Sequence, residues 1–160
     1  MLKGKAIIIT GAGRGIGRAF ALAAAAEGAA VGCIARTTQE IDSVNAEIVK
    51  LTGRSGYTEA ADVSDFEEIS GAIRSLNEKL GRIDAVIINA GINMEPAPIS
   101  TAEYHQWSQI IDVNLKGAFN TAQSSLKYLK KNEGAKIILI GSGIGHKGAK
   151  NCSAYACSKA

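Results

Sequence analysis

The stretch Thr10-Gly11-Ala12-Gly13-Arg14-Gly15-Ile16-Gly17 decides the fold, because it joins two contrasting patterns. Before it, three successive isoleucines are typical of a buried strand over residues 5–10. After it, a helical pattern runs over residues 15–27. Glycines at such a junction allow a tight turn and let the backbone approach a pyrophosphate, whose charge the helix N-terminus stabilises. The stretch predicts a dinucleotide site; the open alternative is a glycine loop without a ligand.

Strand and helix patterns alternate through the rest of the chain. Apolar runs predict strands over residues 30–35, 57–61, 84–89 and 135–141. Helical patterns follow at about residues 37–51, 64–80, 100–131 and, as a start, 154–160. Such alternation indicates an α/β fold, a Rossmann-type doubly wound parallel sheet in the order 3-2-1-4-5. Its ligand is expected at the carboxyl ends of the strands, where the first and fourth diverge.

Spacing and caps predict how the first three helices begin and which residues they bury. Capping boxes are expected at Thr37 with Glu40, at Ser64 with Glu67, and, for the long helical segment, at Ser100 with Glu103. The expected buried positions are Ile16, Phe20 and Ala23 in the first helix, Ile41, Val44, Ile48 and Leu51 in the second, and Phe66, Ile69, Ile73, Leu76 and Leu80 in the third.

Composition narrows the class of protein. A length of 160 residues, with 46% apolar and 21% charged residues, is typical of one packed domain covering residues 1–160. A net charge of +3 is too small to indicate nucleic acid or a membrane surface. Three cysteines and two distant histidines predict neither a disulfide framework nor a metal site. No apolar run reaches the ~18 residues of a membrane helix, so we expect a cytoplasmic protein.

Four downstream residues form a candidate reacting group. Asn114 lies in Val-Asn-Leu-Lys-Gly, Ser142 follows the fifth predicted strand, and Tyr155 and Lys159 lie in Tyr-Ala-Cys-Ser-Lys. The i, i+4 spacing places the last two on one helix face, where an ammonium favours the ionised form of a phenol. Each residue taken alone also fits an ordinary structural role, such as a cap or a solvent-facing side chain.

Together with the Gly-x-x-x-Gly-x-Gly spacing from Gly11, this set resembles the short-chain dehydrogenase/reductase family, in particular its 3-oxoacyl-(acyl-carrier-protein) reductases. The resemblance implies that Tyr155 exchanges the substrate proton and Ser142 holds the carbonyl oxygen. It implies that Lys159 also binds the nicotinamide ribose and that Asn114 anchors a water of a proton relay. The implied cofactor contacts are Gly11, Arg14, Gly15, Ile16, Gly17, Asp62, Val63, Asn89, Ala90 and Gly91.

Two positions need separate comment, because one departs from the family pattern and the other has a second explanation. The family's usual Asn-Asn-Ala-Gly is changed here, since Ile88 replaces the first Asn, which is expected to cost one polar contact. Asp62 also fits a turn residue ahead of the third helix.

The coenzyme is predicted from charge. Arg36 stands at the end of the second strand, where an acidic residue would repel a 2′-phosphate, and Arg14 adds a second cation. Guanidinium groups suit phosphate, so NADP is expected over NAD. The alternative is that both arginines are solvated surface charges.

The resemblance implies hydride transfer between nicotinamide and a small-molecule carbonyl or alcohol, and a homo-oligomer that pairs through the fourth and fifth predicted helices. Family members continue beyond the position of Ala160, so we expect a C-terminally truncated chain whose last strands are missing. The second hypothesis is a nucleotide-binding module or inactive fragment that binds NADP(H) without turnover.

Overall fold

The structure, a computed structural model, describes residues 1–129 and 132–160. Its centre is a parallel sheet in the order β3-β2-β1-β4-β5, which confirms the predicted doubly wound α/β fold. Strand β2, Ala30–Ala35, has its predicted bounds, and the other strands are shorter than predicted by one to three residues: β1 Ala6–Thr10, β3 Tyr57–Ala60, β4 Ala85–Ile88 and β5 Lys136–Leu139.

Helices follow the strands as the crossovers of a parallel sheet require. Their bounds are α1 Gly15–Ala26, α2 Thr38–Thr52, α3 Phe66–Leu80, α4 Tyr104–Ile111, α5 Gly117–Leu129, α6 Gly143–Lys147 and α7 Ser153–Lys159, with a π-helical turn, η1 Asp112–Lys116, between α4 and α5. Among the described helices, none combines the length and the hydropathy needed to cross a membrane.

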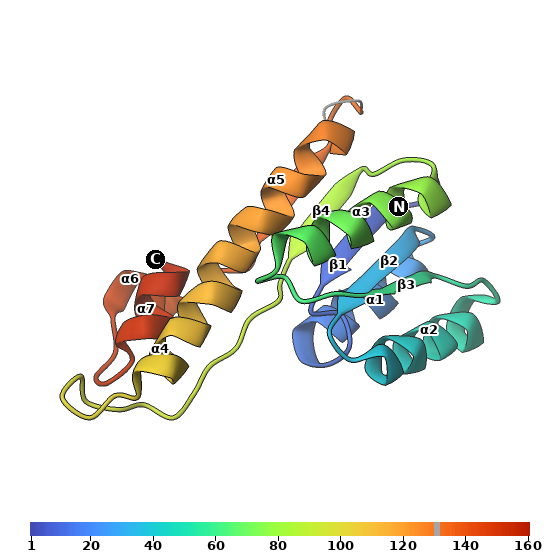
Figure 1. The fold of residues 1–160 in the computed structure, drawn as a ribbon. Coiled ribbons are helices and arrows are strands. Elements are labelled where there is room, and N and C mark those ends of the chain that lie inside the picture. Colours follow the sequence, from blue (N-terminus) through green and yellow to red (C-terminus); the bar gives the residue numbers. More distant parts are fainter. Residues whose placement is uncertain (130–131) are drawn as a thin grey trace.

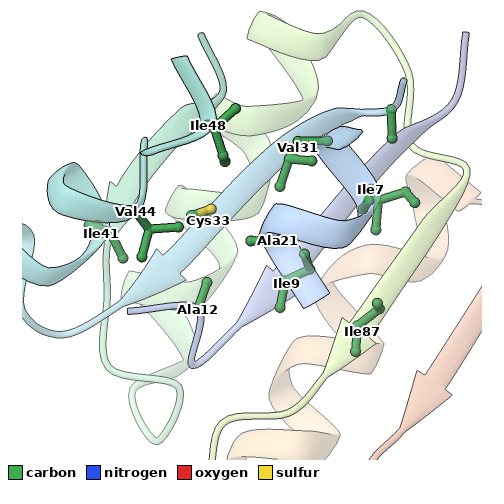
Figure 2. Packing of buried hydrophobic residues seen from close by; sticks show 13 residues of the cluster. Ile7, Ile9, Ala12, Ala21, Val31, Cys33, Ile41, Val44, Ile48 and Ile87 are labelled. Atoms are coloured by element: carbon green, nitrogen blue, oxygen red, sulfur yellow. The ribbon is translucent and has the colours of Figure 1, made fainter. Parts of the chain in front are cut away.

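Helices cover both faces of the sheet (Figure 1), and a cluster of buried apolar residues lies on each face. Ile7 and Ile9 of β1 point to the face covered by α1 and α2, where Val31 and Cys33 also pack (Figure 2). Ile8, between them in sequence, packs on the opposite face with α3 and α5. Because successive side chains of a strand point to opposite faces, the isoleucine run supplies both cores.

The buried face of α1 differs from the predicted one. Gly17, Ala21, Ala24 and Ala25 are buried, whereas Ala23 is exposed and Phe20 is only partly buried. Ile16 is 62% exposed, since it lies at the mouth of the glycine loop rather than against the sheet. Isoleucines of β1 lie below α1, where the small Ala21, Ala24 and Ala25 are buried, while the larger Phe20 and Leu22 pack against the same cluster only partly buried.

Helix α2 confirms part of its predicted stripe. Ile41, Val44 and Ile48 are buried, but Leu51, in the last turn of the helix, is 57% exposed. Thr37 does occupy the cap position, yet its side chain makes no capping hydrogen bond, and Glu40 does not return one. The prediction of a capping box is therefore wrong, since neither of its two side-chain hydrogen bonds forms.

The start of α3 is shifted by one residue from the prediction. Asp65, not Ser64, is the cap, and its carboxylate accepts from the backbone N–H of Glu68 at 3.0 Å. The Ser64 hydroxyl donates to Asp62 instead. The predicted stripe is otherwise buried at Ile69, Ile73 and Leu76, with Leu80 partly buried, while Phe66 in the first turn is 41% exposed.

The predicted long segment over residues 100–131 begins later, with Glu103 in the cap position of α4, because residues 99–101 form a turn. Its last two residues, Lys130 and Lys131, lie outside the described residues. The segment after β5 contains α6, capped by Ser142. Helix α7 packs against both α6 and α4 at one end of the molecule (Figure 1).

Candidate active site

A cavity of about 690 Å³ opens at the carboxyl ends of β1, β2 and β4, where the two halves of the sheet diverge. Its volume lies in the range of ligand sites, roughly 300–1,000 Å³. Of the residues expected to carry function, the ones that line it are Gly11, Arg14, Gly15, Ile16, Arg36, Asp62, Val63, Asn89, Ala90, Gly91, Ser142, Tyr155 and Lys159. Gly17 and Asn114 do not line it.

Glycine is required in the loop at two kinds of position. Gly15 adopts φ +55° at the first turn of α1, a left-handed conformation that favours glycine. Gly17 is buried, and a Cβ atom there would collide with the carbonyl oxygen of Gly11. At Gly11 a Cβ would lie 2.8 Å from the Ala90 Cα atom. Glycine at both positions therefore allows the close packing of the loop against α1 and the end of β4.

Thr10 and Asn89 join the ends of β1 and β4. The fully buried Thr10 hydroxyl accepts from the backbone N–H groups of Asn89 and Ala90, both at 3.1 Å. The Asn89 side-chain amide donates to the carbonyl oxygens of Thr10 at 3.1 Å and Gly11 at 3.3 Å. These bonds fix the glycine loop against the next strand. Ile88, the departure from the family pattern, packs in the core beneath them.

Charged groups gather at the end of the cavity formed by β2 and β3. Arg36 Nη1 lies 3.8 Å from the Asp62 carboxylate, and both side chains are partly solvated. Arg14, in the cap position of α1, lines the same cavity. Asp62 also accepts from the backbone N–H of Ser64 at 2.9 Å, so its turn role and its place in the cavity coexist.

The opposite end of the cavity holds Ser142, Tyr155 and Lys159. The Lys159 amine donates to the Ile140 carbonyl oxygen at 2.9 Å, which ties α7 to the end of β5. Burial lowers the pKa of Lys159 below its usual 10.5. The Ser142 hydroxyl caps α6 by accepting from Ile144 N–H at 3.4 Å, and its own proton is free to be donated. A hydroxyl, a phenol and an amine thus share one wall.

Asn114 lies outside the cavity and supports this wall through hydrogen bonds. It is 3% exposed, in the π-helical turn η1, and its side chain bonds the backbone of Ile92 in both directions, at 2.8 and 2.9 Å. Its amide also donates to the Ser158 hydroxyl at 3.0 Å, and Ser158 donates to the Tyr155 carbonyl oxygen. Asn114 therefore links the loop after β4 to the helix that carries Tyr155 and Lys159.

Sequence reasoning missed several residues of the site. Glu40 and Thr37 of the β2–α2 junction line the cavity, and so do Ile92 and Ile140. The sequence predicts Glu40 in a capping box, and no local pattern indicates that its carboxylate reaches the glycine loop. The hydrogen-bonding role of Thr10 has a signal in the sequence, since a polar residue closes an all-apolar strand there.

The cysteines lie outside this arrangement. All three are free thiols, and burial in the core raises the pKa of Cys33 to about 12, which leaves it unreactive. Cys157 is exposed and does not line the cavity, in line with its place between Tyr155 and Lys159. Within residues 1–129 and 132–160, no cluster of His, Cys, Asp and Glu is arranged to hold a metal ion.

The sheet order, the glycine loop at its switch point and the cavity above it define an α/β protein of the doubly wound Rossmann type. Residues 5–160 match the family model described as short chain dehydrogenase. The chain belongs to the short-chain dehydrogenase/reductase family of oxidoreductases.

Individual relatives agree with this assignment. The chain is 36% identical to 3-oxoacyl-(acyl-carrier-protein) reductase of Thermotoga maritima, over 99% of this chain and 64% of the relative. The solved structure of levodione reductase superposes with a TM-score of 0.95 at 28% identity, covering 99% of this chain and 62% of the other. NAD⁺-bound xylitol dehydrogenase follows at 0.94 and 28%, covering 99% and 60%. The chain thus spans less than two thirds of the length of these proteins.

Proposed function

We propose that residues 1–160 form an NAD(P)-binding Rossmann domain that uses NADP to reduce a carbonyl, or to oxidise a secondary alcohol, with Tyr155, Lys159, Ser142 and Asn114 as the reacting group. One observation carries the proposal: Tyr155, Lys159 and Ser142 line the same cavity as the glycine loop. Residues more than 120 positions apart in the chain meet where a dinucleotide would place its reactive end.

The residues present fit the coenzyme. The glycine loop leaves room for a diphosphate, since Gly15 lines the cavity and no other atom lies within 4 Å of where its Cβ would be. The N-terminus of α1 stabilises phosphate charge, and Arg14 adds to it. Arg36 would hold a 2′-phosphate, Asp62 and Val63 the adenine, and Asn89, Ala90 and Gly91 the ribose side. When bound, the coenzyme supplies or accepts the hydride.

The chain's own residues handle the proton and the orientation of the substrate. In the reductive direction the Tyr155 hydroxyl gives its proton to the carbonyl oxygen, and the Ser142 hydroxyl donates a hydrogen bond to the same oxygen. The Lys159 ammonium favours the resulting phenolate and binds the ribose. Asn114, by resemblance the anchor of a relay water, holds the Ile92 backbone and Ser158 in register with Tyr155.

Replacing Tyr155 by Phe tests the reaction. Turnover with NADPH and a panel of β-keto esters, quinones and sugars is expected to fall by about 10²–10⁴-fold, because the proton donor is lost. Coenzyme affinity, measured by NADPH fluorescence, is expected to stay within about twofold. Unchanged turnover would remove Tyr155 from the mechanism. If the unaltered chain binds NADPH and turns over nothing, it is the nucleotide-binding module of the second hypothesis.

The coenzyme preference is tested by binding. NADPH is expected to bind more tightly than NADH. Arg36→Ala is expected to weaken the affinity for NADPH about tenfold and to change the affinity for NADH little, since only NADPH carries the 2′-phosphate. Titration calorimetry at low and high salt measures both. A wild-type preference for NADH contradicts the NADP assignment and leaves dinucleotide binding intact.

A further inference from the structure

One carboxylate in the coenzyme cavity has no role in the function proposed above. Glu40 lies in the first turn of α2 and lines the same cavity as Arg14 and Arg36. A Cβ built on Gly13 would lie 2.7 Å from Glu40 Oε2 and 2.8 Å from its Cβ, so the Glu40 side chain lies directly against the glycine loop. The Glu40 carboxylate and the glycine loop are therefore direct neighbours in the cavity.

Glu40 also differs from the other acid at this end. Asp62 has Arg36 at 3.8 Å and the Ser64 hydroxyl at 2.7 Å. Within the part of the chain that the structure describes, no ion pair and no side-chain hydrogen bond engages the half-buried Glu40 carboxylate. Its carboxylate thus has no direct partner among the described residues, while Arg36 is paired with Asp62.

The charges at this end therefore balance: two arginines, Arg14 and Arg36, face two carboxylates, Asp62 and Glu40. A 2′-phosphate brings nearly two negative charges, whereas the 2′-hydroxyl of NADH brings none. A carboxylate that lines the same cavity would repel such a phosphate and would affect an uncharged hydroxyl much less. The arginines favour one coenzyme, and Glu40 opposes that preference.

We propose that Glu40 is a specificity-determining residue that limits the preference for a 2′-phosphorylated coenzyme, so that the protein accepts both NADPH and NADH. This inference rests on the proposed binding of a dinucleotide in the cavity. Glu40 acts by charge and touches no reacting atom. Its removal changes the ratio of the two affinities and leaves the shape of the glycine loop unaltered.

The test compares Kd values of NADPH and NADH for the wild type, Glu40→Gln and Glu40→Lys, by fluorescence titration at low salt. Glu40→Gln is expected to lower the Kd of NADPH about fivefold and the Kd of NADH by less than about twofold. Glu40→Lys is expected to lower the Kd of NADPH further. Rising salt is expected to shrink these differences. Gln keeps the size of Glu beside Gly13, and melting curves check that both variants are folded.

The matched control is Asp42→Asn, which removes one negative charge from the same helix at an exposed position outside the cavity. Its effect on NADPH is expected to be below about twofold. Equal shifts for both coenzymes, no shift in either variant, or the same shift in the Asp42 control overturn the proposal. Wild-type protein that is folded and binds neither coenzyme overturns the proposed function itself, and the role of Glu40 with it.

Discussion

At the scale of the residue, Lys159 shows how position changes chemistry. Its amine is half-buried between α7 and the end of β5, and it donates to the Ile140 carbonyl oxygen. Burial penalises the charged form, so the pKa of Lys159 is lowered from 10.5. The i, i+4 spacing from Tyr155 placed both side chains on one helix face; the carbonyl partner and the burial depend on a strand about twenty residues earlier.

This shift makes a prediction about stability and pH. Between the lowered pKa and 10.5, the unfolded chain holds more protons on Lys159 than the folded chain, so raising the pH favours the folded state. The melting temperature of the wild type, relative to Lys159→Met, is therefore expected to rise from neutral pH toward 10.5. Lys147→Met, at an exposed lysine of α6, controls for the loss of one charge. A difference that falls with pH contradicts the assignment.

At the scale of the element, α1 shows where hydrophobic periodicity does not predict the buried face of a helix. The segment from Ala21 to Ala26 contains five alanines and one leucine, so apolar spacing cannot say which face is buried. The buried face is set by tertiary contacts: Ala21, Ala24 and Ala25 pack in the cluster with Ile7 and Ile9 of β1, and Gly17 lies against Gly11. In α3, by contrast, the helical spacing of Ile69, Ile73 and Leu76 makes the buried stripe predictable. Its cap differs from the prediction, since Asp65 and not Ser64 occupies that position.

A pair of substitutions tests the buried face of α1. Ala21→Leu is expected to lower the free energy of unfolding by about 1–3 kcal/mol, because Ala21 is fully buried against the sheet and a larger side chain overpacks the core. Ala23→Leu, the same change at an exposed position two residues on, is expected to stay within about 0.5 kcal/mol of the wild type. Urea unfolding measures both. Similar values for the two variants would favour the originally predicted face.

At the scale of the whole molecule, an apolar stripe runs along the outer side of η1 and α5. Leu115, Phe119 and Leu126 are 49%, 62% and 42% exposed, and their spacing of four and seven residues places them on one helix face. They lie in the predicted fourth helix, through which the family resemblance implies pairing. We propose that a homo-oligomer covers this stripe, since large exposed apolar patches mark interaction sites.

Sedimentation tests this assembly. The wild-type protein is expected to sediment as an oligomer at micromolar concentration, and Phe119→Lys is expected to shift it to the monomer, because a charge would be buried at the interface. Lys116→Glu, at an exposed position of the same segment already occupied by a charged residue, is expected to leave the oligomer in place. A monomeric wild type rules out the stripe as an oligomer interface under these conditions.

The order of strands and helices, the doubly wound sheet and the glycine loop follow from the amino-acid sequence, because periodicity and turn chemistry act between neighbouring residues. Three features of the site follow from tertiary packing: Glu40 lies against the glycine loop, Asn114 bonds Ile92 and Ser158 from outside the cavity, and Arg36 meets Asp62. Each of these depends on side chains from separate elements approaching within a few ångströms, and packing of the sheet and its helices sets those distances.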